Sequence, residues 1–206
     1  MGVLTFNDLR RYDRHGMGQL YGPVGAVATT PVQVFKIDGG ERGTDQTVAH
    51  MIRLILSQWG AHNPSVVMTA RKIVQQSGQR GKDYAGEIAA IHSWVQRNVR
   101  YTQDPRGLEW LQTAVYTLEH KSEGSDCDDH TILNCSLALA LGHGAAIRVV
   151  KTDPQRTDEF SHVYAMAGVR TPQGVRWIAM DTTQPHPAGW EPGRIFGHKT
   201  YVVAQP

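Results

Sequence analysis

The stretch GSDCDDH at residues 124–130, together with the run TILNCSLALAL at residues 131–141, decides the fold of this sequence. The apolar side chains of the run point around most of a helix circumference, and Gly142 stands where a helix commonly ends. A helix that is apolar nearly all round is buried. The stretch therefore predicts a central, buried helix from residue 127 to residue 141, with Cys127 in its first turn.

Cys127 has surroundings that favour a reactive thiol. The first turn of a helix presents unpaired backbone N–H groups and the positive end of the helix dipole, and both favour the thiolate over the thiol. A thiolate that acts on a carbonyl also needs a histidine as base and a carboxylate that orients the histidine. The chain contains ten histidines, so geometry has to select the partner.

A predicted hairpin selects His162 and Asp181. TPQG at residues 171–174 has proline and glycine at the positions that a type I turn favours. A hairpin folded there places Tyr164 opposite Asp181 and His162 opposite Thr183, so that His162 and Asp181 are diagonal neighbours within reach of a hydrogen bond. A slip of one residue would put them on opposite faces, so the prediction depends on the register.

The other elements are predicted from caps, periodicity and turns. Helices are expected at residues 44–58, capped by Thr44 or Asp45, after Asn63-Pro64 and after Asp83. Strands are expected at residues 32–37, 146–151, 160–167, 175–181 and 201–204. This order predicts an α+β fold, in which N-terminal helices and the central buried helix pack on an antiparallel sheet.

The first part of the chain differs from the rest. Residues 1–43 are rich in glycine and are interpreted as an N-terminal extension, followed by one domain at residues 44–206. The extension is expected either to pack on the domain through its strand or to serve as an arm that docks to a partner.

The motifs around the cysteine, the histidine and the aspartate resemble those of the transglutaminase-like superfamily of papain-like cysteine enzymes. The resemblance rests on Gly-x-x-Cys-Asp-Asp before an apolar helix, on SHVY at residues 161–164 and on WIAMDTT at residues 177–183. The segment at residues 91–101 is similar to the one that precedes the cysteine in that family. The family commonly has glycine one or two residues before the cysteine, whereas here Gly124 is three residues before it.

The resemblance implies a papain-like catalytic domain and a set of roles. Cys127 would be the nucleophile, His162 the general base and then acid, and Asp181 the carboxylate that orients His162. In such enzymes the thiolate attacks a carboxamide or peptide carbonyl and forms a thioester, which water or an amine then releases. The expected activity is that of a protease or amidase, or of an acyltransferase of transglutaminase type, on a protein or peptide substrate and without a cofactor. Hydrolysis is preferred, because nothing in the sequence marks a tunnel for an amine.

The oxyanion that forms during such a reaction needs hydrogen-bond donors. The backbone N–H of Cys127 is expected to be one of them. Tyr101, Trp110 and Gln112 stay open as the second donor.

The sequence predicts neither a metal site nor a disulfide, although two metal sites have to be considered. A calcium loop is excluded, because Thr131 and Leu137 stand where such a loop needs glycine and glutamate. A zinc site with Cys127, His130 and nearby acids lacks the paired-cysteine spacing of structural zinc and is the minor alternative. Cys135 is expected in the core as a free thiol, since two cysteines eight residues apart on one helix are about 12 Å apart. His130 and His143 are expected at the helix surface or at a helix end.

Charge and hydropathy exclude several classes of protein. Lys and Arg total 21 and Asp and Glu total 19 among 206 residues, and this net charge of +2 argues against a nucleic-acid partner. No apolar run approaches the roughly 18 residues of a membrane span, and the N-terminus lacks the apolar stretch of a signal peptide. The sequence thus predicts a cytoplasmic protein without a membrane partner. Residues 107–135 hold six acids and one lysine, which would attract a cationic or amine-bearing substrate.

A second class of function fits the same resemblance. Small members with a Cys-Asp-Asp series also occur among bacteriophage and prophage proteins. The alternative hypothesis is therefore a non-catalytic structural or assembly protein, for example a virion component, that docks to its partner through residues 1–43.

Overall fold

The computed structural model describes residues 4–5, 32–35, 38–79, 82–103 and 109–206 of the chain. Its helices are α2 (Gly40–Leu56), α3 (Pro64–Ser77), α4 (Tyr84–Asn98), α5 (Ala114–Glu119) and α6 (Cys127–Ala140). Its strands are β1 (Leu4–Thr5), β2 (Val32–Phe35), β3 (Glu109–Gln112), β4 (Gly144–Lys151), β5 (His162–Thr171), β6 (Gly174–Met180) and β7 (Gly197–Ala204).

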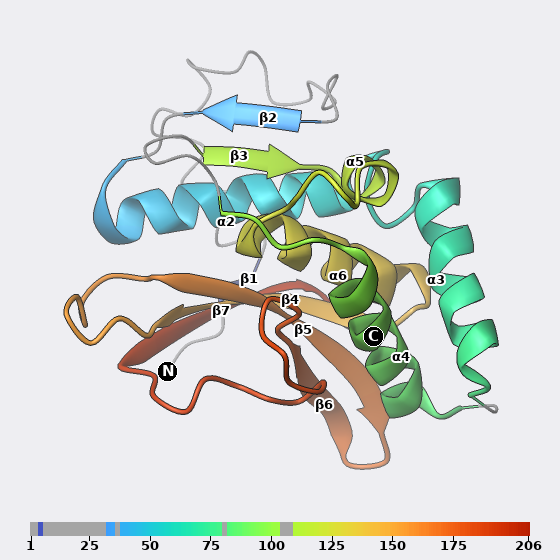
Figure 1. Ribbon diagram of the computed structural model, residues 1–206. Coiled ribbons are helices and arrows are strands. Elements are labelled where there is room, and N and C mark those ends of the chain that lie inside the picture. Colours follow the sequence, from blue (N-terminus) through green and yellow to red (C-terminus); the bar gives the residue numbers. More distant parts are fainter. Residues whose placement is uncertain (1–3, 6–31, 36–37, 80–81, 104–108) are drawn as a thin grey trace.

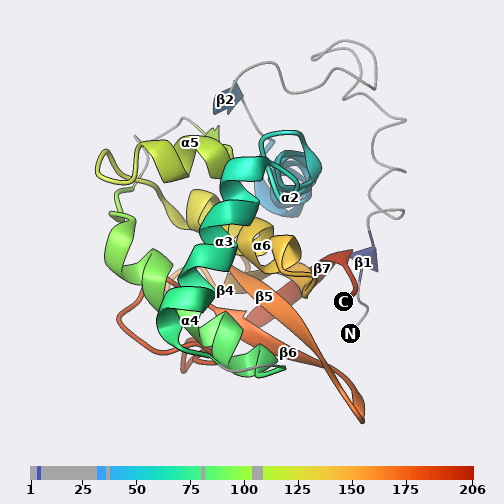
Figure 2. The same cartoon turned by 90° about the vertical axis from the view of Figure 1, so that its right-hand side faces the viewer.

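Helix α6 lies at the centre of the structure, between the main sheet and the outer helices (Figures 1 and 2). The sheet has the order β1-β7-β4-β5-β6, and its pairs are antiparallel except for β1 with β7. Ile132, Leu133 and Leu137 of α6 are fully buried in the core between these layers. The structure confirms the α+β class and the central buried helix, which ends before Gly142 at φ +85°.

The helix caps explain where the outer helices begin, with one exception. Asn63 accepts the N–H of Ser65 at the start of α3, and Asp83 accepts the N–H of Gly86 at the start of α4, so both predicted caps are confirmed. The cap predicted for α2 is wrong, because this helix already begins at Gly40. Asp45 is instead buried inside α2, where it accepts hydrogen bonds from the Tyr201 hydroxyl and the Lys199 ammonium group.

The predicted register of the β5–β6 hairpin is confirmed. Its pairs run from Ala165 opposite Met180 to Thr171 opposite Gly174. The hairpin projects beyond the helices at its turn (Figures 1 and 2). This register brings the first residue of β5 close to the residue that follows β6.

Part of the first 43 residues pairs with the remainder of the chain. β1 pairs with β7, and β2 pairs with β3 in a separate two-stranded sheet. The boundary predicted at residue 43 falls within α2, and the division of the chain at that point stays a prediction. Most of the segment expected to dock to an assembly partner lies outside the described residues. None of the described helices is both long enough and apolar enough to cross a bilayer.

Candidate active site

Cys127 is the first residue of α6, and a capping box fixes the start of this helix. The Asp126 carboxylate accepts the N–H groups of Asp128 at 3.0 Å and of Asp129 at 3.4 Å, and the Asp129 carboxylate accepts the N–H of Asp126 at 3.3 Å. Cys127 itself is partly exposed, and its Sγ lies 4.0 Å from Asp128 Oδ1. The acids before and after the cysteine therefore hold the turn that presents the thiol.

Gln112, the last residue of strand β3, stabilises this turn through hydrogen bonds. The fully buried Asp129 accepts the N–H of Gln112 at 2.7 Å. The Gln112 side chain donates to the carbonyl of Gly124 at 3.1 Å and accepts from the hydroxyl groups of Ser125 and Thr117. These contacts make Gln112 a support of the cysteine turn.

The position of the glycine before the cysteine has a structural reason. Gly124 has φ +117°, and a Cβ at this residue would overlap the side chain of Thr102. Thr102 donates its N–H to the carbonyl of Ser125 at 3.0 Å, and the N–H of Ser125 bonds to the carbonyl of Arg100. This close approach of two chain segments requires glycine three residues before the cysteine.

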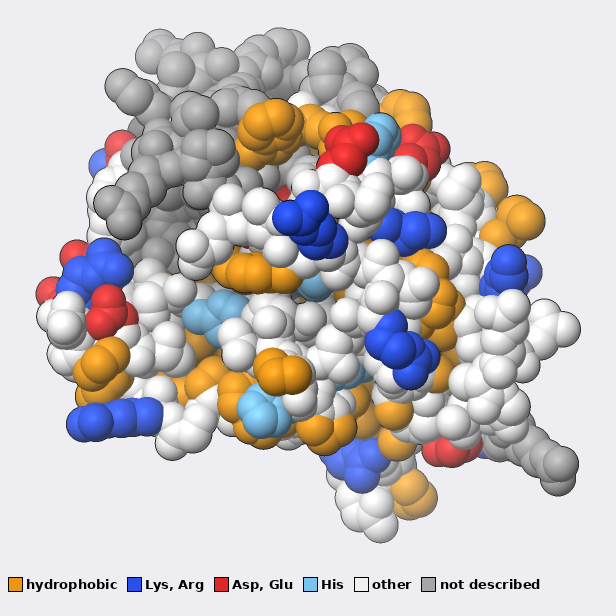
Figure 3. All heavy atoms as spheres, viewed as in Figure 1, with side chains coloured by type: hydrophobic (Ala, Val, Ile, Leu, Met, Phe, Trp, Pro, Cys, Tyr) orange, Lys and Arg blue, Asp and Glu red, His pale blue; other side chains and the backbone are white. Residues whose placement is uncertain are grey.

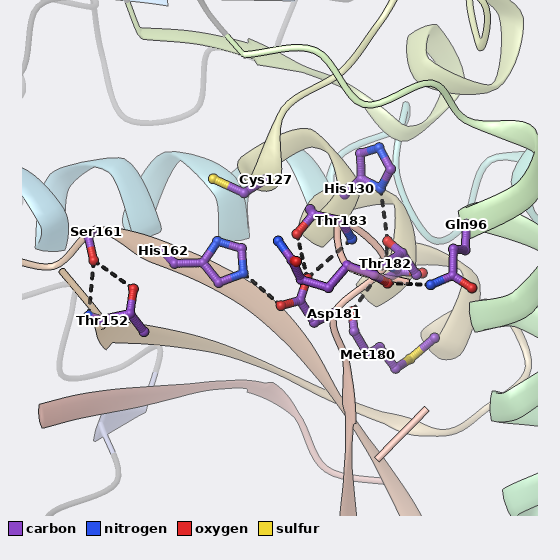
Figure 4. A network of polar contacts seen from close by, with 12 residues as sticks. Gln96, Cys127, His130, Thr152, Ser161, His162, Met180, Asp181, Thr182 and Thr183 are labelled. Carbon is purple, nitrogen blue, oxygen red and sulfur yellow. Dashed lines mark hydrogen bonds and ion pairs between the residues drawn. The ribbon is translucent and has the colours of Figure 1, made fainter. Parts of the chain in front are cut away.

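His162 and Asp181 form a hydrogen bond between the beginning of β5 and the end of β6. His162 Nε2 is 2.8 Å from Asp181 Oδ2, and the Asp181 side chain is 1% exposed. The N–H and the hydroxyl of Thr183 donate to Asp181 Oδ1 at 3.2 and 2.7 Å. Figure 4 shows Cys127 above the His162 ring, with the other ring nitrogen, Nδ1, on the side where Cys127 lies. The structure thus pairs His162 with Asp181, and Cys127 lies above this pair in the view of Figure 4.

The Asp181 carboxylate is kept ionised in this setting. Burial alone would raise the pKa of Asp181, but the hydrogen bond and the charge of His162, together with the donors of Thr183, hold it below its usual range. An ionised carboxylate accepts a hydrogen bond from Nε2–H, so that Nδ1 carries no proton and can accept one from a thiol.

His130 and His143 were expected at the helix surface or at a helix end, and the second alternative holds. His130 lies in the first turn of α6 and His143 just after its last turn, and both are buried. The His130 side chain faces the polypeptide after β6, where Nδ1 is 2.8 Å from Thr182 Oγ1. His143 lies just after α6, and its Nε2 is 2.8 Å from a carboxylate oxygen of Glu87. No pattern in the sequence indicates these partners, which are more than fifty residues away along the chain.

The buried His130 makes stability depend on pH. Burial lowers the pKa of His130 to about 4, so the unfolded chain binds a proton near pH 6.5 that the folded chain takes up only near pH 4. His130 should therefore remove about 3 kcal/mol of unfolding free energy as the pH falls through this window. Urea unfolding between pH 7 and pH 4 should show a weaker pH dependence in His130→Gln than in the wild type. Identical slopes in the two proteins would contradict this assignment.

Two aromatic residues near the cysteine turn are partly exposed. Tyr101 forms an isolated bridge with Ser125, is 42% exposed and packs its ring edge-on against His130, with 6.1 Å between ring centroids. Because His130 is three residues after Cys127 on the same helix, Tyr101 lies over the face of α6 that carries the cysteine. Trp110 of β3 is 39% exposed.

Neither cysteine takes part in a disulfide, as predicted. Cys135 is buried in the core, where its Sγ is 3.5 Å from the carbonyl oxygen of Ala146. Within the described ranges, no three side chains among His, Cys, Asp and Glu are grouped so that they could hold a metal ion. The His130 ring faces Thr182, so nothing in this geometry supports the zinc alternative.

Three of the six acids between residues 107 and 135 lie next to Cys127 in the sequence, and the structure gives them different surroundings. Asp129 is buried and Asp126 caps the helix, whereas Asp128 Oδ1 lies 4.0 Å from the sulfur of Cys127. Figure 3 shows acidic side chains near α5, whereas hydrophobic and histidine side chains lie at the surface around the middle of this face.

The comparison with protein families decides the affiliation of the chain. The model of the transglutaminase-like superfamily matches residues 69–182, more than half of the sequence, and this span contains Cys127, His162 and Asp181. The chain belongs to this superfamily. The family resemblance predicted from the sequence is thereby confirmed, together with its papain-like arrangement of helices on an antiparallel sheet.

Two solved structures are similar to this superfamily member. One is a candidate cysteine protease from Cytophaga hutchinsonii, with 19% identity and a TM-score of 0.44 over 66% of this chain and 42% of that chain. The other is EGTA-treated LapG from Legionella pneumophila, with 13% identity and a TM-score of 0.39 over 91% of this chain and 75% of that chain. The present chain thus covers less than half of the Cytophaga protein. No curated protein matches its sequence.

Proposed function

We propose that this superfamily member is a cysteine-dependent peptidase or amidase that acts on an amide of a protein or peptide. The observation that carries the proposal is the 2.8 Å hydrogen bond between His162 and Asp181, with the partly exposed Cys127, at the start of α6, above the His162 ring in Figure 4. Cysteine and histidine sit on separate elements, each fixed by buried polar contacts, as nucleophilic catalysis requires.

The proposed reaction has two halves. His162 Nδ1 accepts the proton of the Cys127 thiol while Nε2–H donates to Asp181, and the thiolate attacks the amide carbonyl. The imidazolium then gives its proton to the leaving nitrogen, the C–N bond breaks, and a thioester remains. In the second half His162 takes a proton from water while the water oxygen attacks the thioester carbonyl. The C–S bond then breaks, the carboxylic acid leaves, and His162 returns the proton to the sulfur, which regenerates the Cys127 thiol.

We assign the oxyanion to two donors in this scheme. The first is the backbone N–H of Cys127, at the N-terminal end of α6, where N–H groups point out of the helix. The second is the Tyr101 hydroxyl. Burial, followed by the negative charge of Cys127, raises the pKa of Tyr101, so its hydroxyl keeps the proton that it would donate.

Tyr101→Phe tests the second donor. The loss of one oxyanion donor is expected to lower kcat by about 10²–10³-fold and to leave KM nearly unchanged. Steady-state kinetics on a fluorogenic peptide would measure both constants. Tyr116→Phe is the matched control, because Tyr116 stacks on His120 of α5 and not over the cysteine helix. A kcat of Tyr101→Phe equal to that of the control would remove Tyr101 from the mechanism.

The acid beside the thiol favours substrates with a positive charge. Asp128 lies 4.0 Å from the sulfur, so its carboxylate can attract a lysine side chain or another amine near the scissile amide. Peptides that carry lysine next to the reacting amide should be better substrates than the same peptides with glutamate.

Intact-mass analysis separates the possible outcomes of the reaction. The protein is mixed with glutamine- and lysine-containing peptides, with and without a primary amine. Fragments or deamidated peptides would indicate hydrolysis, whereas loss of ammonia with gain of the amine would indicate transfer. A mass of the protein raised by one acyl group would identify the thioester. Unchanged peptides together with an unchanged mass of the protein would contradict the proposal and favour a non-catalytic structural role.

A further inference from the structure

Helix α6 carries more than the nucleophile on the face that contains Cys127. His130 and Asn134 follow three and seven residues after Cys127 and therefore belong to the same stripe of the helix. Both side chains are buried, and both reach the same residue of another element, Thr182. Figure 4 shows Thr182, in the segment that follows β6, with its side chain joined to His130 of α6 by a hydrogen bond.

The hydroxyl of Thr182 is held from two sides. The Asn134 side-chain amide donates to Thr182 Oγ1 at 2.8 Å, and His130 Nδ1 lies 2.8 Å from the same oxygen. Since the Asn134 amide donates to Thr182 Oγ1, the Thr182 hydroxyl can itself donate a hydrogen bond to Nδ1 of a neutral His130. Asn134 also donates to the carbonyl oxygen of Met180 at 3.4 Å.

These contacts enclose Asp181 between two anchored neighbours. Met180 and Thr182 are both held by α6, and the Asp181 carbonyl oxygen lies 3.2 Å from His92 Nε2 of α4. The backbone of Asp181 is thereby fixed relative to the helix that begins with Cys127. Its side chain is the partner of His162.

We propose that Thr182 is a positioning residue that ties the Asp181 carboxylate to the cysteine helix. In this way Thr182 fixes where the Asp181 carboxylate, and with it the His162 ring, lies relative to the Cys127 thiol. The nucleophile and the carboxylate that orients its base then belong to one rigid unit. This inference rests on the proposed function of the site. Because Thr182 is 4% exposed, its effect should fall on kcat rather than on KM.

Thr182→Val removes the hydroxyl and keeps the shape of the side chain. We expect kcat to fall by about 10²-fold, as for a misplacement of about 1 Å, with KM unchanged. Thr182→Ser, which keeps the hydroxyl, should restore most of kcat. Thr131→Val is the matched control. Thr131 lies on α6 between His130 and Asn134, is 1% exposed and has a hydroxyl without a hydrogen-bond partner among the described residues. Its kcat should equal that of the wild type.

A second readout reports the His162–Asp181 hydrogen bond without turnover. The proton on Nε2 of a histidine bonded to a carboxylate gives a strongly downfield NMR resonance. This resonance should be present in the wild type, in Thr182→Ser and in Thr131→Val, and it should be broadened or lost in Thr182→Val. If Thr182→Val does not fold, Asn134→Ala takes its place, with a smaller loss of kcat and a weaker resonance.

The outcomes separate this inference from the proposed function. A wild-type protein with the resonance but without turnover would contradict the proposed function, and the resonance in the variants would still decide the role of Thr182. A wild-type resonance and a wild-type kcat in Thr182→Val, or in Asn134→Ala in its place, would overturn the inference.

Discussion

Cys127→Ala is expected to abolish turnover, with a loss of at least about 10⁴-fold in kcat, because the variant lacks the atom that forms the thioester. Folding should be nearly unaffected. Cys127 is only partly buried, and the capping box that starts α6 involves its neighbours Asp126 and Asp129. The measurement is peptide turnover combined with urea unfolding of the same sample.

Cys135→Ala is the control for the loss of a sulfur atom. Cys135 is 1% exposed, and burial raises the pKa of its thiol well above the usual value, so it is an unreactive core residue. Its replacement should lower the unfolding free energy by about 1–2 kcal/mol through the cavity that it leaves, and should leave turnover unchanged. Turnover retained in Cys127→Ala but lost in Cys135→Ala would reverse the assignment of the two thiols.

Asp181→Asn is expected to lower kcat by about 10⁴-fold although it changes few atoms. The N–H and the hydroxyl of Thr183 donate to Asp181 Oδ1, so they would select the carbonyl oxygen of an asparagine for that position. The amide NH₂ would then face His162 Nε2 and donate to it. His162 would carry its proton on Nδ1, where it could no longer accept the thiol proton.

Adding Thr183→Val to Asp181→Asn tests this explanation. Loss of the Thr183 hydroxyl weakens the preference for one orientation of the asparagine amide, since only the backbone N–H still donates to it. The double variant should regain part of the lost kcat. Equal kcat values for the single and the double variant would mean that the asparagine acts through loss of charge and not through the histidine tautomer.

Local signals in the sequence predicted most of the fold. Asn63 and Asp83 mark helix starts because a cap acts on backbone groups two or three residues away, and the turn at residues 171–174 sets the hairpin register in the same way. The start of α2 was missed, because Asp45 looks like a cap but bonds to Tyr201 in the distant strand β7. Strand β3 and the six-residue α5 were missed, because both are too short to show a period.

The sequence also pointed to part of the candidate site, namely the residues that carry local signals. Cys127, His162 and Asp181 carry signals of their own: a helix start, and two positions of one hairpin. Gln112 was a candidate only for a different role, as an oxyanion donor, and Thr182 carries no signal. The importance of both comes from contacts across many residues of sequence, with Gly124 and with His130 and Asn134. Nothing in the sequence near His130 predicts its burial, because its partner Thr182 is 52 residues away.

The pH dependence of Cys127 alkylation tests most directly whether Cys127, His162 and Asp181 act as one unit. Iodoacetamide labelling, located by peptide mass mapping, should be fast in the wild type well below about pH 8.5, the pKa of an ordinary thiol, while the native protein leaves Cys135 unlabelled. In His162→Ala the rate should drop and follow an ordinary thiol. A slow rate in the wild type with an ordinary pH profile, or the same fast rate with and without His162, would contradict the account.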